Sequence, residues 1–266
     1  MKEFLGIGGY QRVPEGAWSW QHITFVTAML IAMFAISIFL GIKNKHKTPE
    51  QKNKALIWAA ILIDAFEIFK IAVRIYDSGF SIMRVLLPLF LCSIQLITIP
   101  LAAFTKGRLK EAALDFVLTF GILGAVFGTV GAAQNYASYP VFSIHNVVSA
   151  ITHCISGFAS LYIGISGMQS LKWKNLPITM GILGFFTAAA LIANITLDYN
   201  YMFLMNHDGT PYVIFWNMVG GNQVLYAIVV VLIFVIYIVA FYWIYNLIKT
   251  KKKAKEPALE KEEALV

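Results

Sequence analysis

The stretch Gln223–Ile248, QVLYAIVVVLIFVIYIVAFYWIYNLI, contains no charged side chain and is followed at once by a lysine-rich segment. A helix needs about 20 mostly apolar residues to cross a hydrocarbon core roughly 30 Å thick. This stretch is longer than that, and its length favours a transmembrane helix over a buried strand. It therefore predicts a membrane-spanning helix with a basic flank.

The composition of the whole chain agrees with this stretch. Hydrophobic residues make up 59% of the 266 positions and charged residues 13%, against about 45–50% and about 25% in soluble domains. The net charge of +7 falls in short clusters between apolar runs, which indicates membrane topology and no nucleic-acid partner. The two cysteines, Cys92 and Cys154, lack metal-type spacing, so we expect no metal, no cofactor and no disulfide framework.

Six further apolar runs predict helices of the same kind. Sixteen of the 21 Lys and Arg residues fall in loops on one side, whereas two, Lys2 and Arg12, fall on the other. Because the basic side faces the cytoplasm, the sequence predicts an all-α, multi-pass bundle of about seven transmembrane helices in the cell membrane, with its N-terminus outside. This domain covers residues 1–248, and residues 249–266 form a disordered, charged cytoplasmic tail. The expected spans are 18–42, 55–76, 82–104, 112–132, 143–168, 176–197 and 223–248.

Four ionisable residues interrupt the second run: Asp64, Glu67, Lys70 and Arg74. The last three share one helical stripe because they are three and four residues apart. Charges in lipid are costly unless they are paired or hydrated. The stripe therefore indicates either an ion network inside the bundle, with Glu67 paired to Lys70 or Arg74, or the lining of a water-filled cavity.

Cys92 lies in the third run, one helical turn after Pro88, and Gln95 follows a turn later. Pro88 donates no amide hydrogen, which frees the carbonyl of Arg84 and favours a kink. A cysteine in an apolar run is usually an inert small hydrophobe. From the pattern alone, Cys92 is a candidate nucleophile against that simpler interpretation.

The fifth run carries a stripe of polar side chains three or four residues apart: His145, Ser149, His153, Ser156 and Ser160. Such a stripe often indicates only close helix packing. His153, however, is as far from the outer start of its run as Cys92 is from the start of its own, so we expect both at one depth. An imidazole within hydrogen-bond reach is a common way to make a thiol nucleophilic, and equal depth permits that contact.

Several motifs carry a resemblance to a known family: the run Leu87–Cys92, His153 downstream of Tyr139-Pro140, and Asn194 followed by the string NYMFL at 200–204. Together they resemble the YwaF-type bacterial membrane proteins. That family is grouped with the eukaryotic transmembrane ether-phospholipid acyltransferases, the transmembrane protein 164 family, and more remotely resembles the androgen-induced transmembrane hydrolases. Phe90 stands where many bacterial relatives carry histidine, and the loop after Leu204 lacks their usual Lys-Pro pair, which leaves substrate specificity open.

The resemblance implies a lipid acyltransferase or acyl hydrolase embedded in the membrane. Cys92 would accept the acyl chain from a phospholipid or lysophospholipid, and His153 would be its base. The alternative is a non-enzymatic carrier or receptor in which the charged second span lines an internal polar path. Contact between Cys92 and His153 would favour the enzyme. Further residues are predicted to line the site: Gln95, His145, Ser149, Asn194, Tyr201, Glu67, Lys70 and Arg74.

Overall fold

The computed structural model describes residues 1–168 and 171–263, and this part of the chain consists of helices and connecting loops. The long helices are α2 (Trp20–Asn44), α3 (Pro49–Ser78), α5 (Gly107–Val130), α7 (Ile144–Ile165), α8 (Leu176–Leu197) and α10 (Gln223–Glu263). The short α-helices are α1 (Lys2–Leu5), α4 (Gln95–Phe104), α6 (Ala133–Ser138) and α9 (Val213–Met218), and the 3-10 helices are η1 (Phe80–Val85), η2 (Trp173–Asn175) and η3 (Tyr201–Phe203).

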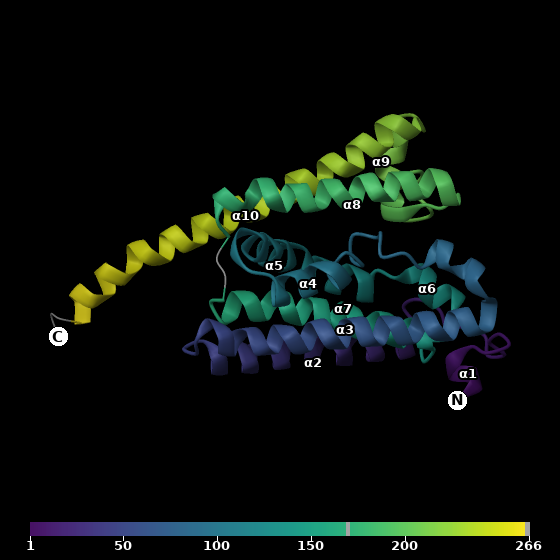
Figure 1. The fold of residues 1–266 in the computed structure, drawn as a ribbon, viewed down its shortest axis with the longest axis horizontal. Helices are drawn as coiled ribbons and strands as arrows, with labels where there is room; N and C mark the ends of the chain where they lie inside the picture. Colours follow the sequence, from purple (N-terminus) through teal and green to yellow (C-terminus); the bar gives the residue numbers. More distant parts are fainter. Residues whose placement is uncertain (169–170, 264–266) are drawn as a thin grey trace.

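The helix α5 lies at the centre of the molecule. Figure 1 shows it between one group formed by α2, α3 and α7 and a second group formed by α8, α9 and α10. Residues 112–121 of α5 are all buried, as expected of a helix that is covered on every side. The core of the fold is therefore built around α5, with α7 as its most extensive neighbour.

Small residues allow α5 and α7 to approach closely. A Cβ atom on Gly121 would lie 2.6 Å from the carbonyl oxygen of Ser156 and 2.8 Å from Cβ of Ser160. Both serines also join the helices by hydrogen bonds. Ser156 Oγ donates to the carbonyl of Gly121 at 3.3 Å, and Ser160 Oγ donates to the carbonyl of Leu118 at 2.8 Å. The inner part of the predicted polar stripe is thus a helix-packing surface.

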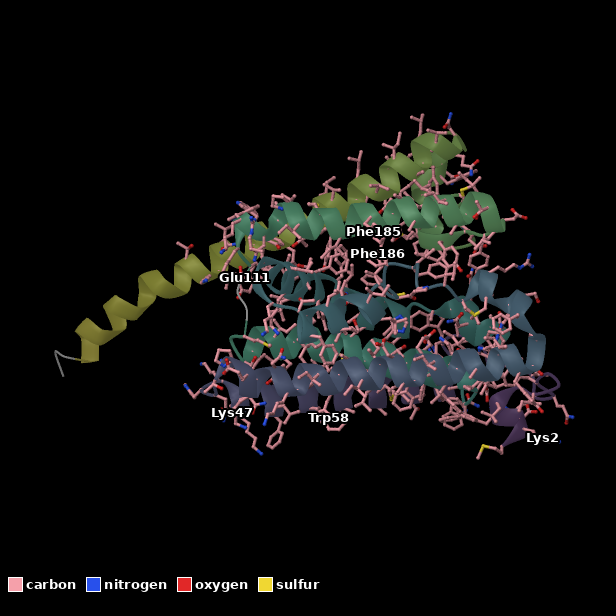
Figure 2. All side chains as sticks on the ribbon, in the orientation of Figure 1. Lys2, Lys47, Trp58, Glu111, Phe185 and Phe186 are labelled. Carbon is pink, nitrogen blue, oxygen red and sulfur yellow. The ribbon has the colours of Figure 1, made fainter. Side chains whose placement is uncertain are left out.

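The long helices expose many large apolar side chains, and the mostly apolar interior also contains polar ones. His22, Gln95 and Asp115 are buried, whereas Trp58 is exposed on the outside of α3 (Figure 2). In water such large exposed apolar faces would drive association, so the arrangement fits a lipid environment. Other large apolar side chains exposed on the long helices are Ile31, Phe39, Ile68, Phe185, Ile195, Ile236 and Trp243.

In the described part of the chain, five helical segments are long and apolar enough to cross a membrane: Trp20–Asn44, Gly107–Ser138, Ile144–Ile165, Trp173–Leu197 and Gln223–Thr250. The helix α3 is of similar length but carries the charged stripe. The structure therefore supports a multi-pass membrane protein, and the count of seven spans stays a prediction.

The prediction of one continuous helix over residues 82–104 was wrong. The 3-10 helix η1 ends at Val85, residues 86–94 form turns, and α4 begins only at Gln95. The physical reason is Pro88, which lacks an amide hydrogen and also disfavours a helical conformation in the preceding residue. A non-helical segment, residues 86–94, thus replaces the expected kink and carries Cys92.

The last helix, α10, continues through Ile248 to Glu263. The predicted division at Ile248 between a membrane domain and a disordered tail stays a prediction. Lys47 and Glu111 lie at one end of the bundle and Lys2 at the other (Figure 2). This separation agrees with the predicted alternation of loops and does not depend on which end faces the cytoplasm.

Candidate functional site

Cys92 and His153 are brought together where the non-helical segment meets α7. The two side chains lie side by side against α5: a Cβ atom on Gly124 would lie 3.5 Å from Cβ of Cys92, and one on Gly128, a turn further, would overlap the ring of His153. The thiol and the imidazole are thus close enough for their charges to act on each other. Both residues are half-buried, and Sγ of Cys92 also lies 4.0 Å from Oγ of Ser93. Cys92 is two residues before the N-cap of α4, Ile94, where the amides of a helix N-terminus carry partial positive charge.

The ring of His153 is oriented by Ser149. Its Nδ1 lies 2.6 Å from the carbonyl oxygen of Ser149 and 3.3 Å from the Oγ of the same residue. A carbonyl oxygen can only accept a hydrogen bond, so Nδ1 carries the proton and Nε2 has the free lone pair. The imidazole is therefore in the tautomer that can accept a proton from a thiol. Ser149 contributes mainly through its backbone.

Two glycines of α5, Gly124 and Gly128, make room for the pair. A Cβ atom on Gly128 would overlap the ring of His153, whereas one on Gly124 would lie 3.5 Å from Cβ of Cys92, an ordinary contact. Sequence reasoning missed both residues. Their Gly-x-x-x-Gly spacing on an apolar helix was the available signal, because this spacing marks a close approach between membrane helices.

Gln95, the first residue of α4, is fully buried. Its Oε1 accepts a hydrogen bond from Oγ1 of Thr98 at 3.0 Å. Its Nε2 has no hydrogen-bond partner among the described residues. A buried amide donor without a partner among the described residues therefore lies three residues after Cys92.

Tyr201 holds the non-helical segment in place. Its hydroxyl donates to the carbonyl of Arg84 at 2.8 Å and accepts from the amide of Leu87 at 3.1 Å. The carbonyl that Pro88 was predicted to free is thus satisfied by a side chain, as buried backbone requires. Tyr201 contacts the Leu87 end of the segment, and Cys92 follows five residues after Leu87.

Asn194 fixes Tyr201 in turn. Its Oδ1 accepts from the amide of Tyr201 at 2.6 Å, and its Nδ2 donates to the carbonyl of Tyr201 at 3.0 Å. The next residue, Met202, has φ of 55°, a left-handed conformation that is costly outside glycine. Asn194 and Tyr201 therefore act as a clamp on the non-helical segment. Their predicted role in shaping the outer mouth of the site stays a prediction.

The charged stripe of α3 is partly paired inside the bundle. Lys70 Nζ lies 2.8 Å from Glu67 Oε2, and both side chains are mostly buried. This confirms the prediction that Glu67 pairs with one of the two bases. Arg74 instead donates from Nη1 to Nε2 of His145 at 2.8 Å and to the hydroxyl of Tyr139 at 3.4 Å.

An aromatic cluster, Tyr10, Tyr139 and His145, surrounds the guanidinium of Arg74. The rings of Tyr139 and His145 stack with centroids 4.1 Å apart, and Tyr10 packs edge-on against both. Sequence reasoning missed the two tyrosines, because nothing in the order of residues shows that the N-terminal segment folds back onto the start of α7. His145 and Arg74 were both predicted.

The Cys92–His153 pair and the charged stripe belong to one polar region. Arg74 contacts His145, which lies on the same polar stripe of α7 as His153. Tyr212, in the segment before α9, also faces this region: burial raises its pKa first, and charge at Cys92 raises it further. Tyr212 was not predicted from the sequence.

Cys154 faces away from this region. It is buried, its thiol donates to the carbonyl of Met29 at 3.6 Å, and it packs with Met33 and Ala125. Consecutive residues of a helix point about 100° apart, which is why Cys154 and His153 face different neighbours. Cys154 therefore serves as a matched control for Cys92.

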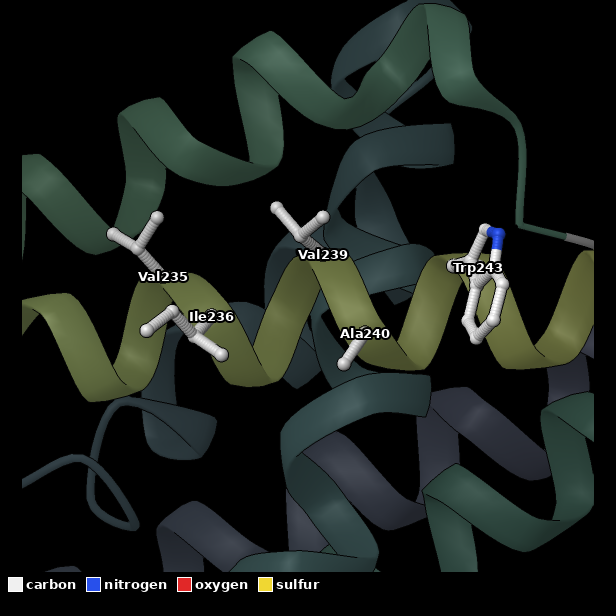
Figure 3. A pocket seen from close by; sticks show the side chains of 5 residues that line it. All are labelled: Val235, Ile236, Val239, Ala240 and Trp243. Carbon is white, nitrogen blue, oxygen red and sulfur yellow. The ribbon is translucent and has the colours of Figure 1, made fainter.

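A wide apolar groove of about 320 Å³ lies on α10. Figure 3 shows its lining side chains spaced along the helix: Val235, Ile236, Val239, Ala240 and Trp243. None of them belongs to the Cys92 region. In the described part of the chain, no group of three His, Cys, Asp or Glu side chains is placed to hold a metal ion.

Long apolar helices, exposed apolar faces and buried polar side chains together define a multi-pass α-helical membrane protein. The profile of the TMEM164 family matches residues 17–245, and the chain belongs to that family. The matched range includes every residue of the candidate site except Tyr10. No curated protein matches the chain, and no solved structure does.

Proposed function

We propose that this protein is a membrane-embedded acyltransferase or acyl hydrolase that acts on acyl esters of phospholipids or lysophospholipids. Cys92 is the nucleophile and His153 is the base. The observation that supports this most is that Cys92 and His153 lie side by side against Gly124 and Gly128 of α5, with Nδ1 of the imidazole held by a carbonyl oxygen. A nucleophile, a base and a group that orients the base form the usual minimal arrangement for such chemistry.

In the proposed reaction, His153 Nε2 takes the thiol proton and the sulfur attacks the ester carbonyl carbon. A C–S bond forms, the ester C–O bond breaks, and the proton passes from His153 to the leaving alcohol. The hydroxyl of a lysolipid or water then attacks the thioester, giving its proton to His153, and the thiol is restored. The buried Nε2 of Gln95 is the donor we assign to the oxyanion.

Membership in the TMEM164 family and the resemblance to ether-phospholipid acyltransferases and YwaF-type bacterial proteins support the same reading. The mostly buried Glu67–Lys70 pair is also compatible with the rival function, a carrier or receptor with an internal polar path. The two functions differ in whether Cys92 becomes acylated.

The direct test is acyl-enzyme formation in membranes incubated with acyl-labelled phospholipid. Cys92→Ser should lose the label that neutral hydroxylamine releases, because only a thioester is cleaved under these conditions, whereas Cys154→Ser should retain it. Full hydroxylamine-sensitive labelling in Cys92→Ser would contradict the proposal and favour the carrier.

A second test uses His153. His153→Ala should form acyl-enzyme about 10²- to 10⁴-fold more slowly at neutral pH, the usual contribution of a general base. It should recover partly at alkaline pH, where the thiol ionises without help. A uniform loss at every pH would argue that His153 only supports the fold.

A further inference from the structure

Arg74 leaves one edge of its guanidinium group unused. Its contacts with His145 and Tyr139 are both made by Nη1. Its Nε is buried and has no hydrogen-bond partner among the described residues, and Nη2 makes no bond to them. The Nε–Nη2 edge is the fork through which arginine binds a carboxylate or phosphate with two parallel hydrogen bonds.

The charge of Arg74 is also not neutralised by a carboxylate of the described chain. The nearby acids have other partners: Glu67 pairs with Lys70 at 2.8 Å, and Asp77 accepts the amide hydrogen of Gly8 at 2.9 Å. Guanidinium stays protonated at any physiological pH. A half-buried cation in a membrane segment is expected to have a partner, so the unused fork points to an anion supplied from outside the chain.

The position of Arg74 relates this anion to the Cys92 region. Arg74 contacts His145 near the start of α7, and His153 lies eight residues further along the same helix, a distance of about 12 Å along the axis. Side chains of a helix lean toward its N-terminus, so Arg74 leans along α3 toward the level of Lys70. The guanidinium of Arg74 therefore lies within about two helical turns of His153.

We propose that the Nε–Nη2 fork of Arg74 binds the phosphate of the phospholipid whose acyl ester reaches Cys92. This inference rests on the proposed function. In a glycerophospholipid the phosphate and the ester carbonyl are separated by only a few bonds. Binding the phosphate at Arg74 fixes the ester beside Cys92 and selects phospholipids over neutral acylglycerols.

The test measures binding without turnover, in the Cys92→Ser background. The purified protein is heated in neutral detergent with oleoyl lysophosphatidylcholine, mono-oleoylglycerol, oleate or inorganic phosphate. The lysophospholipid should raise Tm and mono-oleoylglycerol should not. With Arg74→Gln added, the same rise in Tm should need roughly ten times more lysophospholipid, or more still, because a charge-assisted hydrogen bond is lost. Arg84→Gln is the matched control, because Arg84 is an exposed arginine in η1, which follows the end of α3 that carries Arg74.

Several outcomes would overturn the inference. These are an unchanged shift in Arg74→Gln, an equal shift with mono-oleoylglycerol, and a full shift with inorganic phosphate or oleate alone. If Arg74→Gln does not fold, Arg74→Lys keeps the charge but loses the fork, and it should still weaken binding. A normal lysophospholipid shift without any acylation of wild-type Cys92 would refute the proposed function alone. Acylation without the Arg74-dependent shift would refute only this inference.

Discussion

At the scale of single residues, the sequence identified the candidate pair but not the space around it. His153 stood out because it belongs to the polar stripe of α7. Cys92 stood out because it is as far from the start of its run as His153 is from the start of its own. The equal-depth argument assumed a continuous helix that the structure does not have. Gly128 was missed because a glycine's role depends on which side chain lies against it, and one sequence does not show that.

Gly128→Ala should impair the site without unfolding the bundle. The new methyl group would occupy the place of the His153 ring and displace the imidazole from the thiol. A misplacement of about 1 Å can cost roughly 10²-fold in rate, so acyl-enzyme formation should fall by about that factor. Gly124→Ala, one turn away on α5, adds a methyl group in ordinary contact with Cys92 and should retain most of the rate. Equal losses in both variants would contradict this account.

Glu67→Ala should destabilise the protein more than the double variant Glu67→Ala/Lys70→Ala. The single change leaves the ammonium of Lys70 mostly buried without its partner at 2.8 Å, whereas the double change removes both charges. We expect a difference of about 2 kcal/mol in the free energy of unfolding, measured by denaturation in detergent. Equal effects would indicate that the pair is hydrated.

At the scale of elements, regular helices were predicted well and the broken one was not. The expected span at 176–197 coincides with α8, Leu176–Leu197. The run at 82–104 has the same apolar composition, but its hydrogen bonds depend on Tyr201, far away in the sequence. The effect of Pro88 on Arg84 was predictable, and the partner that would replace the lost hydrogen bond was not.

Tyr201→Phe should loosen the non-helical segment while keeping the aromatic ring. It leaves the carbonyl of Arg84 and the amide of Leu87 without their partner, at a cost of about 1–3 kcal/mol for each buried group. Tm in detergent should fall and acyl-enzyme formation should slow. Tyr199→Phe is the control: its ring packs on Tyr201 at 4.8 Å, and its hydroxyl makes no hydrogen bond to the described residues. A greater loss in Tyr199→Phe would contradict the clamp.

At the scale of the whole molecule, composition alone predicted the membrane class, and the family match agrees with it. The arrangement of helices around α5 could not be predicted, because all the apolar runs look alike to a pattern based on hydrophobicity. Only the structure reveals that residues 112–121 are buried on every side.

The orientation of the bundle can be tested directly. Because sixteen basic residues fall in one set of loops and two in the other, the basic side should stay in the cytoplasm. A reporter that fluoresces only in the cytoplasm should be bright when fused after Lys255 and dark when fused at Met1. The reverse pattern would show that the assignment is inverted.

The dependence of residues 86–94 on Tyr201 also has a consequence for biosynthesis. The carbonyl of Arg84 and the amide of Leu87 form hydrogen bonds with the hydroxyl of Tyr201, which lies 117 and 114 residues further along the chain. While the ribosome is still making the intervening helices, these groups cannot enter lipid unpaired. If the third apolar run spans the membrane as predicted, the segment should stay in contact with water or with the insertion machinery until α8 and the loop after it have emerged, and the run should complete its insertion late.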